Sequence, residues 1–387
     1  MATITATQSG NASAGATWTG GVKPGSSDTA DLNGKTVTVD VDAEAWHIAS
    51  LIDSGGGGIL TVTAATTRNI TIDDLALPAT AFFQVPADAV LNITGAASTL
   101  ISANDSHAGT LNFLGNITSA TGGVQASAGK VNVTGAMTTS GAASYGIHSI
   151  GDTARIVVTG NLSHTGTNSA VRAAGGFCKV NGNVESSASS VINPVSSGIT
   201  VVNGNVSYTG AEANVNAIHL ATSAKALVIV NGNVSTSATS ASYAVYVQAS
   251  SSGACIISGN TSAPNATNTI SVTANGGPVI VLGTITGGAT IAAGVLITNG
   301  AIPTSNWTNV SGGIWMHIGP KPAALPAAPG PSIGLPAITK LAFGEKYFAD
   351  TTAPTGAATW SVDLAADLNQ SAVLGTHGEL MRLSALA

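Results

Sequence analysis

Short runs of alternating apolar and polar residues recur along the chain, and each run turns at a glycine. In Lys179–Ser186 (KVNGNVES), valines flank a Gly-Asn pair, and Val201–Ser207 and Val228–Ser235 repeat this pattern closely. Such alternation predicts strands with one buried face, and the Gly-Asn pair predicts a corner between two strands. With looser copies included, the central glycines are Gly95, Gly115, Gly135, Gly160, Gly182, Gly204, Gly232, Gly259 and Gly283.

The spacing of these glycines, 20 to 28 residues, is the length of one turn of a stacked repeat protein. We therefore predict an all-β fold, a right-handed parallel β-helix (solenoid) of about 20–28 residues per coil. Positions four and two before the glycine, and two after it, are mostly apolar and are expected to face the core. A further short strand recurs between corners, for example at Tyr243–Val247, which gives three strands per coil.

The residue after the central glycine is usually asparagine. Asparagine tolerates left-handed backbone, and its amide can hydrogen-bond to an identical residue on the next coil. We interpret this column as a structural corner ladder rather than a binding motif. Its members are Asn116, Asn161, Asn183, Asn205, Asn233 and Asn260.

The column three residues before the glycine is expected to point outward, and its character changes along the chain. It begins as asparagine (Asn92, Asn112, Asn132) and ends as isoleucine. A strand that is apolar on both faces is normally covered on both faces. We expect the later part to pack on another copy, as in a three-fold assembly, or on the C-terminal part of the same chain. The candidate interface residues are Ile229, Ile256 and Ile280.

Composition divides the chain into four parts. Residues 1–60 are expected to form an N-terminal cap, in which Trp18 and Trp46 cover the end of the core. Residues 61–316 form the parallel β-helix, 317–336 a proline-rich linker, and 337–387 a small C-terminal docking or anchoring element that could include a short helix.

Charge is scarce and favours few ligand classes. Charged residues make up 8% of the chain, against about 25% in an ordinary soluble protein, and the net charge is −6. The twelve Lys and Arg are scattered along the sequence, so we expect no nucleic-acid partner. The first residues lack the basic and apolar regions of a signal peptide, and no apolar run is long enough for a membrane helix, so we expect no membrane partner.

Cys178 and Cys255 share one position of the repeat, four residues before a central glycine. They lie three coils apart, or roughly 14 Å at about 4.8 Å per coil. A disulfide needs Cα atoms within about 7 Å, so we predict two unpaired cysteines in the core.

No motif for catalysis, a cofactor or a metal is present, and we predict none. The acids Asp152, Glu185 and Glu212 fall on different coils, so the carboxylate pair of a glycosidase is not indicated, although a polysaccharide depolymerase stays open. Lys179, Glu185 and Arg172 are explained as solvated outer residues, and His148 and His219 as strand histidines. Four tyrosines could form a sugar-stacking surface, but edge packing is favoured: Tyr145, Tyr208, Tyr243 and Tyr246.

Two features resemble the β-helical structural proteins of tailed bacteriophage virions. One is Trp18-x-Gly20-Gly21-x-x-Pro24-x-x-x-Asp28 followed by Lys35–Val39, and the other is the series of Gly-Asn coils over 90–300. The resemblance implies a homotrimer on the virion surface, made in the host cytoplasm and bound to other virion proteins. A capsid decoration, cement or head-fibre protein, with the major capsid protein as partner, is favoured because a solenoid cap begins almost at Met1. The alternatives are a tail fibre or tailspike that binds host surface polysaccharide, and a bacterial adhesin.

Overall fold

The computed structural model describes residues 2–301, except 42–45, 79, 142–143, 222–224, 239–241, 250, 264–268, 274–276 and 293. Of the remainder it describes the backbone of β35 (Trp307–Asn309), β36 (Gly313–His317), β37 (Leu341–Phe343) and β38 (Lys346–Phe348). The chain divides into two units, Met1–Val184 and Glu185–Ala387.

In the first unit, successive coils contribute parallel neighbours to two long ladders of strands. One ladder is β1 (Thr3–Thr5), β3 (Thr29–Asp31), β5 (His47–Ile52), β7 (Thr67–Leu75), β9 (Val90–Ala97), β11 (Thr110–Leu114), β14 (Lys130–Thr134), β17 (Arg155–Thr159) and β20 (Phe177–Asn181), with β12 (Ile117–Ser119), β15 (Met137–Thr139) and β18 (Leu162–His164) after the corner. The other is β2 (Gly10–Asn11), β4 (Thr36–Val39), β6 (Ile59–Val62), β8 (Phe82–Gln84), β10 (Ile101–Ala103), β13 (Val124–Ala126), β16 (Ile147–Ser149) and β19 (Val171–Ala173).

The second unit repeats this organisation with three parallel ladders. They are β22 (Ile199–Val202), β25 (Leu227–Val230), β28 (Ala254–Ile257), β31 (Val279–Val281), β34 (Gly294–Thr298) and β36; then β23 (Val206–Tyr208), β26 (Val234–Thr236), β29 (Thr261–Ser262) and β32 (Ile285–Thr286); and β24 (Ile218–Leu220), β27 (Val245–Val247), β30 (Ile270–Val272), β33 (Ala289–Ile291) and β35. The strand β21 (Val184–Ser186) contains the unit boundary, and β37 and β38 pair antiparallel.

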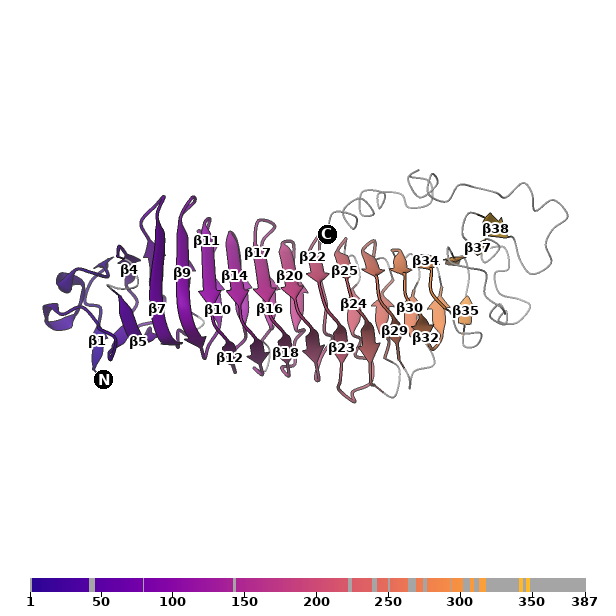
Figure 1. The fold of residues 1–387 in the computed structure, drawn as a ribbon, viewed down its shortest axis with the longest axis horizontal. Helices are drawn as coiled ribbons and strands as arrows, with labels where there is room; N and C mark the ends of the chain where they lie inside the picture. The colour runs from indigo at the N-terminus through magenta and orange to yellow at the C-terminus, as the bar shows by residue number, and fades with distance from the viewer. Residues whose placement is uncertain are drawn as a thin grey trace. The chain divides into compact units, whose positions relative to one another are not determined.

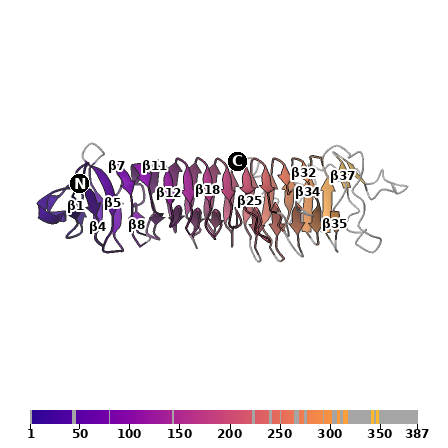
Figure 2. The same ribbon diagram turned by 90° about the horizontal axis from the view of Figure 1, so that it is seen from below.

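The predicted fold class is confirmed: each unit is an all-β solenoid of stacked parallel strands. Figures 1 and 2 show the strands of each unit side by side in both views. The helical structure in the described residues is limited to two single 3₁₀ turns, Gly15–Thr17 and Thr19–Gly21.

The predicted core columns are also seen. Leu111, Val131, Ile156 and Cys178 stand in register on successive strands, and each is fully buried. Stacking like residues at a fixed spacing buries apolar surface, and each Å² removed from water stabilises the fold by about 25 cal/mol. Because each column uses one sequence position per coil, the sequence period alone fixes which side chains pack together.

Glycine is needed at the corners because successive coils come too close there for a side chain. A Cβ on Gly115 would overlap the backbone carbonyl of Gly95, and one on Gly232 would overlap that of Gly204. The same overlap with the preceding corner glycine recurs at Gly135, Gly160, Gly182, Gly259 and Gly283. The glycine column therefore reflects the spacing between coils, and not only the flexibility of a turn.

The N-terminal end of the first unit is covered by the chain's own early residues. Ala6 and Trp18 form an antiparallel bridge, and the Trp18 indole Nε1 donates to the carbonyl of Ala12 at 2.9 Å. The rings of Trp18 and Trp46 lie 6.3 Å apart, and both side chains are buried. Parallel stacking already starts at β1, so residues 1–60 contain coils of the solenoid as well as its cover.

The two cysteines are unpaired and buried, as predicted. Burial raises the pKa of Cys178 to about 11 and that of Cys255 to about 12. The predictions for the linker and the C-terminal element fall outside the described residues, apart from β36 to β38.

Candidate functional site

The side-chain carbonyls of the corner asparagines accept backbone N–H groups from the next coil. The Asn161 Oδ1 accepts the backbone N–H of Asn183 at 2.9 Å, one coil later. Equivalent bonds run from Ala136 N to Asn116, from Asn233 N to Asn205, from Asn260 N to Asn233 and from Thr284 N to Asn260. None of these asparagines is among the described residues with positive φ, so the tolerance of asparagine for left-handed backbone is not used here. Their side-chain carbonyls instead hold the backbone of the next coil.

A true amide-to-amide ladder lies in the column three residues before the glycine. The Asn112 Nδ2 donates to the Asn92 Oδ1 at 2.7 Å, and the same bond joins Asn92 to Asn69 and Asn132 to Asn112. In the second unit a similar bond lies one residue before the glycine, where the Asn231 Nδ2 donates to the Asn203 Oδ1 at 2.8 Å. The sequence shows the shared register of Asn92, Asn112 and Asn132. The corner column, one residue after the glycine, is nevertheless the one for which the sequence interpretation predicts an amide ladder.

The candidate interface residues are buried within a single chain. Ile229, Ile256 and Ile280 stand in register on β25, β28 and β31, and they are 4%, 7% and 5% exposed. Val228 and Cys255, which alternate with these isoleucines on the same strands, are buried too, so both faces of these strands are covered. A second copy of the chain is therefore not needed to remove these isoleucines from water.

Tyr145, His148 and Arg172 form the first aromatic cluster, next to β16 and β19 of the first unit. The Arg172 Nη1 donates to the Tyr145 hydroxyl at 2.7 Å, and its guanidinium lies 5.1 Å from the Tyr145 ring. The His148 ring lies 4.5 Å from the same ring. Burial, reinforced by the Arg172 charge, lowers the pKa of His148 to about 4, so this histidine is neutral near pH 7.

His219, Tyr243, Tyr246 and Gln248 form the second aromatic cluster, around β24 and β27 of the second unit. Tyr243 and Tyr246 stack at 5.5 Å with an angle of 15° between the rings, and His219 lies 5.3 Å from Tyr246. The His219 Nε2 lies 3.3 Å from the Gln248 Oε1. Burial lowers the pKa of His219, so the cluster presents neutral rings and amides near pH 7.

Tyr208 does not belong to either cluster. It stands in register with Thr236 on the inward side of β23 and β26, and it is 1% exposed. In the sequence the four tyrosines are alike only in residue type. Register separates Tyr208, which follows a corner, from Tyr145 and Tyr243, which both precede a ring residue by three positions (His148 and Tyr246).

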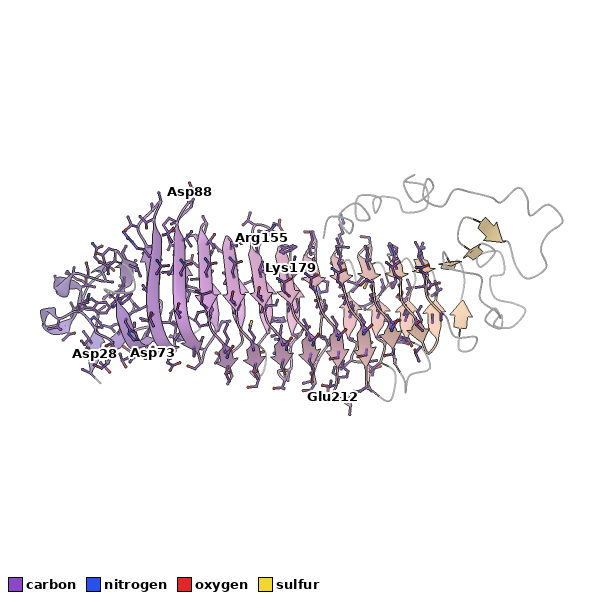
Figure 3. All side chains as sticks on the ribbon, viewed as in Figure 1. Asp28, Asp73, Asp88, Arg155, Lys179 and Glu212 are labelled. Carbon is purple, nitrogen blue, oxygen red and sulfur yellow. The ribbon has the colours of Figure 1, made fainter. Side chains whose placement is uncertain are left out.

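The charged residues that are close in sequence are divided between ladders. Arg172 lies on β19 and contacts Tyr145, which precedes β16. Lys179 lies on β20, beside Val157 of β17. Glu185 accepts a hydrogen bond from the Thr209 hydroxyl at 3.0 Å. The structure instead brings Lys179 near Arg155, which the sequence places more than 20 residues away (Figure 3).

In the described part of the chain, no three His, Cys, Asp or Glu side chains come together to hold a metal ion. Asp73, one of the acids of β7, pairs with His47 at 3.0 Å. In the same part of the chain, no helix is long and apolar enough to cross a membrane.

Comparisons with family models, curated proteins and solved structures gave no match to this chain.

Proposed function

We propose that the chain is a non-enzymatic structural protein of a tailed-bacteriophage virion, most simply a trimeric capsid decoration, cement or head-fibre protein. The proposal rests first on the resemblance of the Trp18–Asp28 segment and the Gly-Asn coils to β-helical virion proteins. Its partner would be the major capsid protein, and its location the virion surface.

The use of the repeated residues is the observation that carries this proposal. The corner glycines, the corner asparagines and the amide ladder all serve contacts between successive coils. A repeat whose polar side chains hydrogen-bond between its own coils provides stiffness and regularity rather than a reaction centre. Such a chain suits a protein that covers or extends a particle.

Mass spectrometry of purified particles tests this role. Virions separated on a density gradient and treated with protease-free nuclease should contain the chain in many copies, at a constant ratio to the major capsid protein across fractions. A chain that stays in the soluble fraction of the lysate, with none on gradient-purified particles, would overturn the proposal.

Recognition of a host surface glycan is a second candidate function, and the second aromatic cluster favours it. The partly exposed rings of Tyr243 and Tyr246 lie beside the amide of Gln248, which combines an apolar face with hydrogen-bonding groups. Tyr246→Ala should then weaken binding to host cells at least tenfold, while Tyr246→Phe, which keeps the ring, should stay close to the parent. Equal binding of all three proteins would remove this candidate.

A further inference from the structure

Three cations that are scattered in the sequence meet on one outer face of the first unit. Lys130 on β14 and Arg155 on β17 are register partners, so their backbones are about 4.8 Å apart. Lys179 on β20 is a diagonal neighbour of Arg155, about 7–8 Å away between Cα atoms. We call Lys130, Arg155 and Lys179 the basic patch; Figure 3 labels two of its members on neighbouring strands.

This arrangement is unfavourable for the isolated chain. Like charges in register on adjacent strands destabilise a sheet, and in the described residues the one ion pair closer than 4.0 Å joins His47 and Asp73, away from the patch. Lys130 and Arg155 are exposed. A chain with only twelve Lys and Arg thus places three of them together, none in an ion pair within 4.0 Å among the described residues, and the nearest acid in sequence is Asp152, in the turn before β17. Proteins typically retain such unfavourable charge repulsion where the surface has a function.

The surroundings of the patch indicate the kind of ligand. Lys130 and Asn132 lie two residues apart on β14, and Asn112 stands beside Asn132 on β11, so amides adjoin one end of the patch. The ring of Phe177 is covered by the Arg155 guanidinium, 4.4 Å from its centre, and is not free to stack on a nucleobase. Adjacent cations and amides match a polymer that carries both carboxylates and hydroxyls.

We propose that the basic patch binds an acidic polysaccharide, with its carboxylates on Lys130, Arg155 and Lys179 and its hydroxyls on the adjacent asparagine amides. This site is separate from the two aromatic clusters, and it does not depend on a virion role. The sequence predicts no basic patch, because the three cations come from different coils.

Binding of the purified full-length protein to immobilised polymers tests this site. The parent should bind a polyuronate such as alginate and should not bind neutral dextran. Raising the salt from about 50 mM to about 300 mM should weaken binding severalfold, because exposed charges are screened. Lys130→Gln with Arg155→Gln should lower the affinity at least tenfold.

The matched control removes the same charge elsewhere, with Lys35→Gln and Lys225→Gln, and should leave the affinity within twofold of the parent. The melting temperature should stay within about 2 °C of the parent, because relief of the register repulsion and loss of the Arg155 contact with Phe177 oppose each other. This result would show that the variant folds. No binding to alginate, equal losses in patch and control variants, or tighter binding to a single-stranded oligonucleotide would each overturn the proposal.

Discussion

Single residues at the corners have distinct tasks, although glycine and asparagine are adjacent in sequence. The glycine lets two backbones approach, and the asparagine then ties the backbone of the next coil through its side-chain carbonyl. Neither task needs a ligand. The same pair would be a weak indication of function in any solenoid of this kind.

Gly115→Ala tests the close approach. The new methyl group would overlap the carbonyl of Gly95, so the coils must separate, and we expect a loss of at least about 2 kcal/mol in unfolding free energy. Gly25→Ala is the control, because its Cβ would meet only a carboxylate oxygen of Asp28 at 3.6 Å. Chemical denaturation of both variants measures the difference, and equal stability would refute the overlap.

Two buried histidines should make stability depend on pH. His107 accepts the Val85 N–H at Nδ1 and donates to the Lys130 carbonyl from Nε2, and both distances are 3.1 Å. His164 likewise uses Nδ1 for the Thr139 hydroxyl at 2.7 Å and Nε2 for the Asn168 carbonyl at 2.8 Å. Burial lowers the pKa of both, although the carbonyl hydrogen bonds oppose this shift.

Because the unfolded chain takes up these protons first, stability is complete above a pH of about 6.5 and falls as the pH decreases toward the lowered pKa values. The loss is at most about 1.4 kcal/mol per histidine for each pH unit in that window. Denaturation at pH 7.5 and at pH 5 should show a smaller difference for His107→Asn with His164→Asn than for the parent. An unchanged difference in the double variant would contradict this account.

Strands and ladders are the scale at which the sequence was most informative. Alternation about the corners predicted the pairing of Val131, Ile156 and Cys178, and the spacing between corners predicted β16, β19, β24 and β27. Register is the physical reason, since one misplaced residue would reverse every inward and outward side chain. What the sequence could not show was which outward side chains meet across coils, as in the basic patch.

The amide ladder should contribute to the stability of its sheet. Asn112→Ala breaks the bonds to both Asn92 and Asn132, and we expect a loss of about 1–2 kcal/mol. Thr118→Ala, an exposed position on the neighbouring β12, should cost no more than about 0.5 kcal/mol. Urea unfolding of the two variants provides the comparison. Equal losses of unfolding free energy would show that the hydrogen bonds of the ladder do not stabilise the sheet.

At the scale of the whole molecule, the sequence repeat determines the fold but does not determine the function. The fold could be derived from glycine spacing, whereas function depends on sites that a solenoid can carry anywhere along its surface. The aromatic clusters and the basic patch became visible only when residues from different coils were placed in register.

Oligomeric state is the first property to measure at this scale. The resemblance to virion proteins predicts a trimer, and light scattering coupled to size exclusion should give three times the 37.7 kDa chain mass. Ile229, Ile256 and Ile280 are buried within one chain, so the subunit contacts of a trimer would involve other residues. A stable monomer at micromolar concentration would contradict the trimer.

Immunogold electron microscopy of intact virions tests the central claim most directly. An antibody against the purified chain, with pre-adsorbed antibody as the control, should mark the heads of the particles at many sites per head. Label confined to the tail would replace the decoration role with a receptor-binding one. Particles that carry no label, while the same antibody detects the chain free in the lysate, would contradict the assignment to the virion.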